Sequence, residues 1–307
     1  MSESEISAKD HGHPRLADVI PMAGKRILVV GASGQVGRAL RDVYAHDASV
    51  EYATRADLDL SDPDLAGARA WRDYSVIVNA AAYTAVDDAE TPAGRVEAWA
   101  ANATGVSRLA SVAATHGITL VHISSDYVFD GTADGFYDED ASFSPLGVYG
   151  QSKAAGDLAA ATAPRHYILR ASWVVGTGRN FVTTMADLAR RGVSPRVVAD
   201  QRGRLTFATD IARAIQHLVD VRAPYGAYNI SSSGDVMAWS EIAREVFRSL
   251  GADPSLVVDT STAEYFAGAE RVVAPRPSNS ALSLTKIEAT GFVPTDGLSG
   301  LRDYVGS

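Results

Sequence analysis

The sequence predicts an α/β fold built on a doubly wound parallel sheet, with a smaller C-terminal α/β lobe. Short β-branched runs alternate with segments of helical periodicity in the first half of the chain, and this order gives parallel strands joined by helical crossovers. A glycine-rich turn follows the first run, and polar side chains follow later ones. Ligands of such sheets bind beyond the carboxyl ends of the strands, so we expect these residues to share one edge.

Composition limits the classes of function. The 307 residues carry a formal net charge of -9, which argues against a nucleic-acid partner because no excess of cations exists to neutralise a polyanion. There are no cysteines, so disulfides and thiolate metal sites are excluded. No apolar run approaches the roughly 18 residues of a membrane span, and we expect no membrane partner and a cytoplasmic protein. Residues 1–23 are polar and are expected to form an arm outside the fold.

The first strand and the turn after it form a dinucleotide-binding pattern. The run Arg26–Val30 leads directly into Gly-x-x-Gly-x-x-Gly and a helical segment. The first glycine permits a tight turn, the second lets the backbone approach a pyrophosphate at the helix N-terminus, and the third lets the helix pack on the strand. A tight turn without a ligand is the alternative. The cofactor-binding residues expected here are Gly31, Gly34, Gln35, Val36 and Gly37.

The end of the second strand, which is expected at about residues 50–53, bears on the choice of cofactor. In NAD-specific sites an acidic residue at this strand end hydrogen-bonds the ribose 2′-hydroxyl, about 20 residues after the first glycine. Glu51 has this spacing, but it lies inside the strand rather than at its end. Thr54 and Arg55 stand at its end instead, and a guanidinium suits a 2′-phosphate. We therefore expect NADPH, with NADH as the alternative. Asp59 and Leu60 are expected beside the adenine, and an ordinary surface role for Arg55 is the competing interpretation.

Small residues follow the strand expected at residues 76–79. Ala81, Ala82 and Tyr83 would lie at the carboxyl edge of the sheet, where small side chains let the nicotinamide half of the cofactor lie flat. Tight packing without a ligand is the alternative.

The rest of the chain divides into two parts. We expect a long helix from about Arg95 to His116 and further strands at 119–123 and 166–170. The strict alternation loosens from about residue 176, with helices expected at 181–191, 210–221 and 240–251. The predicted division is therefore a dinucleotide-binding domain at 24–175 and a mainly substrate-binding lobe at 176–307 that is interleaved with the first domain.

Three side chains suggest proton transfer at the same edge. Tyr149 and Lys153 are four residues apart on a predicted helix and share a face. A neighbouring ammonium lowers the pKa of a phenol, and the phenol then passes a proton to a substrate carbonyl oxygen. Ser125 follows a predicted strand and is expected to hold that oxygen. An ordinary pair on a helix surface is the alternative.

Taken together, these motifs resemble the dTDP-4-dehydrorhamnose reductase family of Rossmann-like, extended short-chain dehydrogenases/reductases. The likeness covers nearly the full length. The segments that carry it are Gly31–Gly37, Asn79–Asp87, Ser125–Gly131, Tyr149–Lys153, Ser172–Val174, Asp200–Gly203 and Arg276–Ser280.

The resemblance implies hydride transfer from NAD(P)H to C4 of a dTDP-linked 4-keto-6-deoxyhexose, with dTDP-4-dehydro-L-rhamnose reduced to dTDP-L-rhamnose. The implied catalytic residues are Ser125, Tyr149 and Lys153, of which Tyr149 and Lys153 would also contact the cofactor. A guanidinium suits the substrate's diphosphate. The implied substrate-binding residues are Ser125, Asp126, Tyr149, Trp173 and Arg276.

The chain also departs from this family's pattern. Tyr83 stands where relatives often have His, Arg204–Thr206 replaces a more usual Pro-Thr, and Thr54 occupies a place that can be acidic. Ala39 and Thr209 occupy positions where some relatives carry magnesium-binding carboxylates, so we expect no structural metal and either a monomer or a homodimer.

Three other functions on this scaffold were considered. A dehydratase is disfavoured because Asp126 is followed by Tyr127 rather than Glu. A 4-ketoreductase of secondary-metabolite deoxysugar synthesis, for example of the dTDP-dihydrostreptose type, stays open because the reaction is the same. A non-catalytic NADP-binding regulatory subunit is the third alternative.

Overall fold

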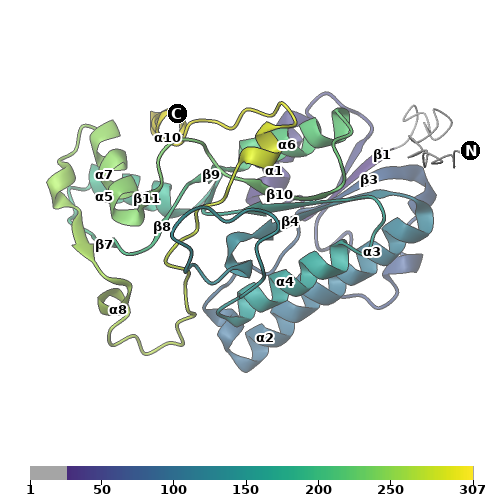
Figure 1. Ribbon diagram of the computed structural model, residues 1–307, viewed down its shortest axis with the longest axis horizontal. Helices are drawn as coiled ribbons and strands as arrows, with labels where there is room; N and C mark the ends of the chain where they lie inside the picture. Colours follow the sequence, from purple (N-terminus) through teal and green to yellow (C-terminus); the bar gives the residue numbers. More distant parts are fainter. Residues whose placement is uncertain (1–25, 307) are drawn as a thin grey trace, which may run out of the picture.

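The computed structural model describes residues 26–306, and the expected arm at 1–23 lies outside these residues. A six-stranded parallel sheet forms the centre, in the order β10-β5-β4-β3-β1-β2 (Figure 1). Its strands are β1 (Arg26–Val30), β2 (Val50–Ala53), β3 (Tyr74–Asn79), β4 (Thr119–Ser125), β5 (His166–Ala171) and β10 (Gly226–Ile230). The predicted doubly wound parallel sheet is confirmed.

The strand order sets the position of the site. The chain begins at β1, adds β2 on one side, and then adds β3, β4, β5 and β10 on the other side. The order therefore reverses between β1 and β3, and the crevice at the carboxyl ends of these strands is the place where open α/β sheets bind ligands. The glycine turn and the segment after β3 lie at that crevice.

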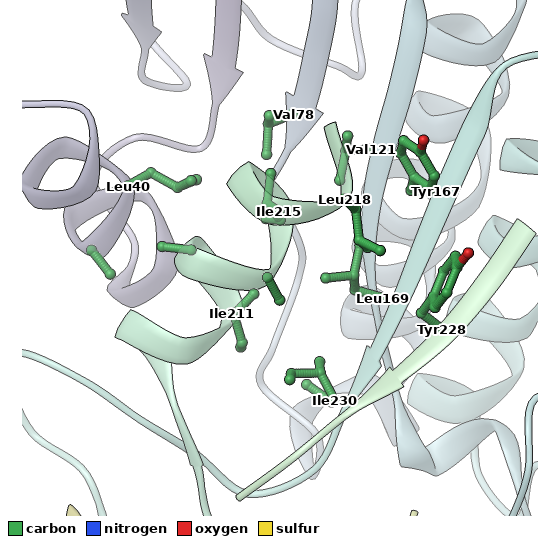
Figure 2. Close-up of a cluster of buried hydrophobic side chains, with 14 of the residues drawn as sticks. Leu40, Val78, Val121, Tyr167, Leu169, Ile211, Ile215, Leu218, Tyr228 and Ile230 are labelled. Atoms are coloured by element: carbon green, nitrogen blue, oxygen red, sulfur yellow. The ribbon is translucent and has the colours of Figure 1, made fainter. Parts of the chain in front are cut away.

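Helices cover both faces of the sheet (Figure 1). On one face α1 (Gln35–Val43) and α6 (Ala208–Asp220) bury Leu40, Ile211 and Ile215 against the strands (Figure 2). On the other face α3 (Gly105–His116) and α4 (Val148–Ala160) pack against Leu28 and Ile77. Burial of such a side chain stabilises a fold by about 1.5–3 kcal/mol, so both layers hold the sheet edge in a fixed shape.

The helix expected from Arg95 to His116 is interrupted. It begins as α2 (Pro92–Trp99), passes through a π-helical segment at Ala100–Thr104, and continues as α3. Thr91 caps its start, accepting a hydrogen bond from the Gly94 N–H at 3.0 Å. The single-helix prediction missed the π-helical segment, a type of bulge that occurs often at functional sites.

The second half of the chain supplies both the edge of the sheet and a separate lobe. β10 is an edge strand of the sheet and α6 packs on one of its faces, whereas α5, α7 and α8 lie beyond one end of it (Figure 1). The remaining helices are α5 (Phe181–Arg190), α7 (Trp239–Ser249), α8 (Thr262–Tyr265), α9 (Thr285–Glu288) and α10 (Gly297–Gly306). The remaining strands pair as β6 (Val174–Val175) with β9 (Thr206–Phe207), β7 (Arg196–Val198) with β12 (Val258–Thr260), and β8 (Arg202–Gly203) with β11 (Met237–Ala238).

Most element bounds lie close to those expected from the sequence. Residues 26–30 and 50–53 form strands as predicted, and α5, α6 and α7 begin and end within one or two residues of the predicted helices. Within residues 26–306, no helix has both the length and the apolar composition needed to cross a membrane.

Candidate active site

The glycine turn between β1 and α1 is closely packed. Gly31 has φ of +82°, and a Cβ there would lie 2.4 Å from the Ala81 nitrogen. A Cβ at Gly37 would lie 2.4 Å from the Gly31 oxygen, so the first turn of α1 packs directly on the turn. Gly34 is the N-cap of α1 and offers no capping side chain, which leaves the helix N-terminus suited to an anion. The close contacts explain the first and third glycines of the motif, and the open helix N-terminus is consistent with the second.

The two other predicted residues of the turn have different surroundings. Val36 is partly buried against the hydrophobic core. Gln35 approaches Gly176 after β6, and its side-chain oxygen is buried without a hydrogen-bond partner among the described residues. A buried acceptor of this kind is suited to a ligand donor at the mouth of the turn.

The end of β2 leaves Arg55 accessible. Glu51 is occupied by Arg69, Tyr74 and Arg26 and does not reach the end of the strand. The Arg55 side chain is 82% exposed, and its Nε lies 3.5 Å from the Asp59 carboxylate. A pair at this distance and exposure contributes little, so the guanidinium is free to change partners.

Two further residues define this corner. The Thr54 N–H and hydroxyl both donate to Asp57, at 2.9 and 2.7 Å, and these bonds lower the Asp57 pKa. Sequence analysis did not single out Asp57. Leu60 is 6% exposed and packs against Gly105, so most of its side chain belongs to the core rather than to an open adenine site.

The segment after β3 is held by Asn102 of the π-helical segment. Asn102 accepts from the Tyr83 N–H at 2.8 Å and donates to the Tyr83 carbonyl at 3.1 Å. It also donates to the Ser152 hydroxyl at 3.0 Å, and Ser152 donates to the Tyr149 carbonyl at 2.7 Å. One buried amide thus joins the predicted nicotinamide segment, which includes Ala82, to helix α4. Asn102 was not predicted as a site residue, although a polar residue among apolar helical positions indicates a buried hydrogen-bonding role.

The structure brings Ser125, Tyr149 and Lys153 together at the ends of β4 and α4. Ser125 and Lys153 are 7% and 2% exposed. Lys153 Nζ donates to the Ile123 carbonyl at 2.7 Å, which fixes it beside β4. The Tyr149 ring meets the Tyr127 ring edge-on, with centroids 5.4 Å apart.

The pKa of Tyr149 differs from the prediction. Burial is the largest cause of its rise to about 12, the charges of Asp126 and Asp157 add to the rise, and a side-chain hydrogen bond with Ser125 opposes it. Lys153 was expected to lower this pKa, and that expectation is wrong for the protein alone. Burial instead lowers the pKa of Lys153 itself to about 8, while the charge of Asp157 opposes that fall. The phenol is therefore a fully protonated acid at neutral pH.

Asp126 lies directly beside the serine. It is 3% exposed and accepts from the Ser125 hydroxyl at 3.0 Å. Burial raises its pKa to about 6, although hydrogen bonds from Ser280 and Ser125 oppose this. A carboxylate buried in this way is characteristic of functional sites, because its burial is unfavourable for stability.

A cavity of about 300 Å³ opens between the sheet edge and the C-terminal lobe. Trp173 lies in it with φ of +45°, and its ring stacks on Trp239 at a centroid distance of 3.7 Å. Arg196 and Arg276 also line the cavity, so one wall is aromatic and two guanidinium groups are present. Ligand sites of this size typically combine apolar walls with a few placed polar groups.

Arg276 is already paired. Its Nη2 lies 2.7 Å from Asp87 Oδ1, and the guanidinium stacks over the Phe266 ring at 4.7 Å. Arg271 contacts the other oxygen of Asp87 at 2.5 Å. Asp87 therefore ties the segment after β3 to the C-terminal segment that holds Arg276. No role was predicted for it from the sequence.

Comparisons with known proteins find relatives along almost the whole chain. The family model described as RmlD substrate binding domain matches residues 25–305. A dTDP-4-dehydrorhamnose reductase from Aggregatibacter actinomycetemcomitans is 37% identical over 299 residues, covering 91% of this chain and 99% of that protein. A probable dTDP-4,6-dihydroxy-2-methyloxan-3-one 4-ketoreductase from Streptomyces antibioticus is 39% identical over 286 residues, covering 91% and 94%.

A solved structure agrees with this similarity. The crystal structure of dTDP-4-dehydrorhamnose reductase from Bacillus anthracis in complex with NADP matches with a TM-score of 0.83 and 30% identity. The match covers 92% of this chain and 98% of that chain. The agreement therefore includes the sheet, the glycine turn and the C-terminal lobe.

Proposed function

The chain belongs to the RmlD substrate binding domain family, and on that premise we propose that it reduces the C4 keto group of a dTDP-linked 4-keto-6-deoxyhexose with NADPH. We propose dTDP-4-dehydro-L-rhamnose as the substrate and dTDP-L-rhamnose as the product. The observation that carries the proposal is the convergence of Ser125, Tyr149 and Lys153 at the edge of the sheet that holds the glycine turn.

The protein offers a site that fits a dinucleotide. The N-terminus of α1 is uncapped, and a Cβ at Gly34 would meet only the Gly31 oxygen, at 3.4 Å, so the missing side chain there leaves room for a pyrophosphate to approach the backbone. Arg55 would take the 2′-phosphate, and Lys153 the nicotinamide ribose. When bound, NADPH supplies the hydride that goes to the keto carbon.

The residues of the chain supply the proton and orient the keto group. Ser125 donates a hydrogen bond to the keto oxygen in place of Asp126, and Tyr149 passes its phenolic proton to the same oxygen as the carbon is reduced. The Lys153 ammonium then stabilises the phenolate until solvent returns a proton. The carbonyl becomes a secondary alcohol by gaining one hydride and one proton.

The cavity beside Trp173 would take the nucleotide end of the substrate. Arg276 would bind the diphosphate, because its planar guanidinium matches phosphate geometry, and it would leave Asp87 in doing so. Arg196 lines the same cavity and offers a second cation. Residues 24–175 would thus act mainly on the cofactor and residues 176–307 mainly on the substrate. The cytoplasmic location and the choice between monomer and homodimer stay predictions.

The test is NADPH oxidation, followed by absorbance, with a panel of dTDP-linked 4-ketohexoses. We expect turnover with dTDP-4-dehydro-L-rhamnose. The second candidate, a 4-ketoreductase of secondary-metabolite deoxysugar synthesis, is favoured by the 39% identity to the Streptomyces antibioticus protein and predicts faster turnover of another 4-ketosugar. NADPH binding without turnover of any member of the panel would instead support a regulatory subunit.

A further inference from the structure

A buried row of side chains continues behind the catalytic lysine. Tyr149, Lys153 and Asp157 are spaced four residues apart on α4, so they lie along one face of the helix with Lys153 in the middle. Lys153 and Asp157 are 2% and 1% exposed. A buried ammonium is unfavourable unless a negative charge lies nearby, and Asp157 is placed to provide it.

The carboxylate of Asp157 lies between Arg170, Ser124 and His122. Arg170 of β5, which is 4% exposed, donates from Nε to Asp157 Oδ2 at 2.9 Å. Arg170 is itself fixed by a 2.7 Å bond to the Glu139 carbonyl. The other oxygen, Oδ1, has no hydrogen-bond partner among the described residues and lies 4.0 Å from His122 Nε2. Burial raises the pKa of Asp157, while the charge of Arg170, a side-chain hydrogen bond with Ser124 and the charge of Lys153 oppose that rise and favour the ionised carboxylate.

His122 adds no positive charge to this cluster. The Asn79 side-chain oxygen accepts from the Ala81 N–H at 3.2 Å, so its amide nitrogen donates to His122 Nδ1 at 3.1 Å. This arrangement leaves the imidazole proton on Nε2, facing Asp157. Burial and the charge of Lys153 lower the pKa of His122 well below its ordinary value, and the ring is neutral.

Other groups packed on α4 do not replace Asp157. Glu90 of the turn Asp88–Glu90 is occupied by the Val148 N–H at 2.7 Å, at the start of the helix. Asp126 lies on the substrate side and acts on Tyr149. The π-helical segment presents the neutral Asn102, and Arg108 of α3 is bonded to the carbonyls of Leu60 and Ser61.

We propose that Asp157 is a positioning residue of the reduction, whose buried carboxylate keeps the Lys153 ammonium charged and in place beside Tyr149. The effect of Asp157 on turnover rests on the proposed function, in which Lys153 is catalytic. Its effect on the charge of Lys153 does not depend on that function. Burial lowers the pKa of Lys153 to about 8, and Asp157 opposes that fall. From such a value, a fall of about one pH unit leaves the lysine about half neutral at pH 7, and a larger fall leaves it mostly neutral.

The lysine can be observed directly by NMR titration of the cofactor-free, full-length protein with ¹³C-labelled lysine side chains. The chain has four lysines, Lys9, Lys25, Lys153 and Lys286, and Lys153→Met identifies the signal by its loss. We expect Asp157→Asn to lower the Lys153 midpoint by about one pH unit or more, because an opposite charge at close range shifts a pKa by about 1–3. Asp157→Glu should restore it. An unmoved midpoint in Asp157→Asn overturns the proposal.

A second variant separates charge from folding. Asp157→Asn leaves Arg170 buried without its partner and can unfold the protein. The double variant Asp157→Asn/Arg170→Gln removes both charges of the ion pair and leaves no buried guanidinium without its partner. The charge of Asp157 acts on the Lys153 pKa, so the proposal predicts that the Lys153 midpoint falls in this variant, whereas a purely structural ion pair predicts no fall. A rise or no change, with the folded state verified by circular dichroism, overturns the proposal even if Asp157→Asn alone does not fold.

The pH dependence of kcat/KM tests the link to catalysis. The charged lysine is the working form, so activity falls as pH rises through its pKa, and Asp157→Asn should move this alkaline fall to lower pH. A moved NMR midpoint with an unmoved alkaline fall overturns the positioning role but leaves the proposed reduction intact. Absence of turnover in the wild-type protein would refute the proposed reduction and leave the NMR result standing.

Discussion

Replacement of Tyr149 by phenylalanine tests the proton donor directly. The variant keeps the ring and its edge-on contact with Tyr127, at a centroid distance of 5.4 Å, and removes only the hydroxyl. With a pKa of about 12, the phenol is protonated at pH 7 in all but about one molecule in 10⁵, so the wild-type protein always has its donor available. Loss of a placed general acid slows a reaction by about 10²–10⁴-fold, which corresponds to about 3–5 kcal/mol in the barrier.

The assay is NADPH oxidation with saturating dTDP-4-dehydro-L-rhamnose, together with a separate fluorescence titration of NADPH. We expect kcat to fall by that factor in Tyr149→Phe while the Kd for NADPH changes less than about threefold, because Lys153 and the glycine turn remain.

Tyr127→Phe is the matched control, since it removes a hydroxyl from the partly buried ring that contacts Tyr149. It should retain most of the activity. If Tyr127→Phe lost activity and Tyr149→Phe kept it, the proton donor would be misassigned. If Tyr149→Phe weakened NADPH binding as much as turnover, its role would be structural and the reasoning from the phenol would fail.

Three other changes have expected outcomes. Arg55→Ala should weaken NADPH binding by about tenfold, since it removes one charge-assisted contact to the 2′-phosphate, and should leave NADH nearly unaffected in parallel titrations. Gly31→Ala should lower the free energy of unfolding in urea by more than Gly117→Ala does. Both glycines have positive φ, which costs an alanine about 1–2 kcal/mol, but only at Gly31 would the new Cβ also lie 2.4 Å from the Ala81 nitrogen. Asp126→Asn should lower activity and should raise the free energy of unfolding at pH 7 by up to about 3 kcal/mol. The stability gain follows because the Asp126 pKa is about 6 in the folded protein and about 3.9 in the unfolded chain, so the wild-type protein loses stability as pH rises through that window.

Each of these has a contrary result. An unchanged preference between NADPH and NADH in Arg55→Ala would remove that residue from the cofactor site, and Arg72→Ala, on the exposed surface, serves as its control. Equal destabilisation in the Gly31 and Gly117 variants would mean that the turn can move away from the Ala81 backbone with no loss of stability, which would contradict the packing argument. For Asp126, a free energy of unfolding that rises between pH 4 and 6 in the wild-type protein, relative to the asparagine variant, would contradict the sign of the pKa shift.

The sheet and the glycine turn were predictable from sequence because their signals are local. A β-branched run of five residues, three spaced glycines and a helical pattern are adjacent in the chain, and the structure explains the first and third glycines by contacts under 3 Å. The resemblance to the reductase family, which rested on such short motifs, is confirmed by the family model and by relatives along almost the full length.

The residues that the sequence did not reveal act across long separations in the chain. Asp87 pairs with Arg276, which lies 189 positions away, and Asn102 reaches Ser152 across 50 positions. A single sequence does not reveal which residues form such pairs, because the two partners are not related by helical or strand periodicity or by the spacing of a motif. The π-helical segment was missed for a related reason, since Asn102, which lies in it, bonds to the backbone of Tyr83 in another segment.

The raised pKa of Tyr149 bears on its role as a proton donor. The prediction of a lowered pKa followed from the i, i+4 spacing to Lys153, but spacing carries no information on burial, and burial is the larger effect here. A lowered pKa suits a base that removes a proton from an alcohol, whereas a reductase needs the proton on the phenol before hydride transfer. A phenol held at about 12 is a reluctant donor, so transfer depends on the Lys153 charge that stabilises the phenolate as it forms. The lysine therefore matters most in the transition state, and its variants should lower kcat more than they raise KM.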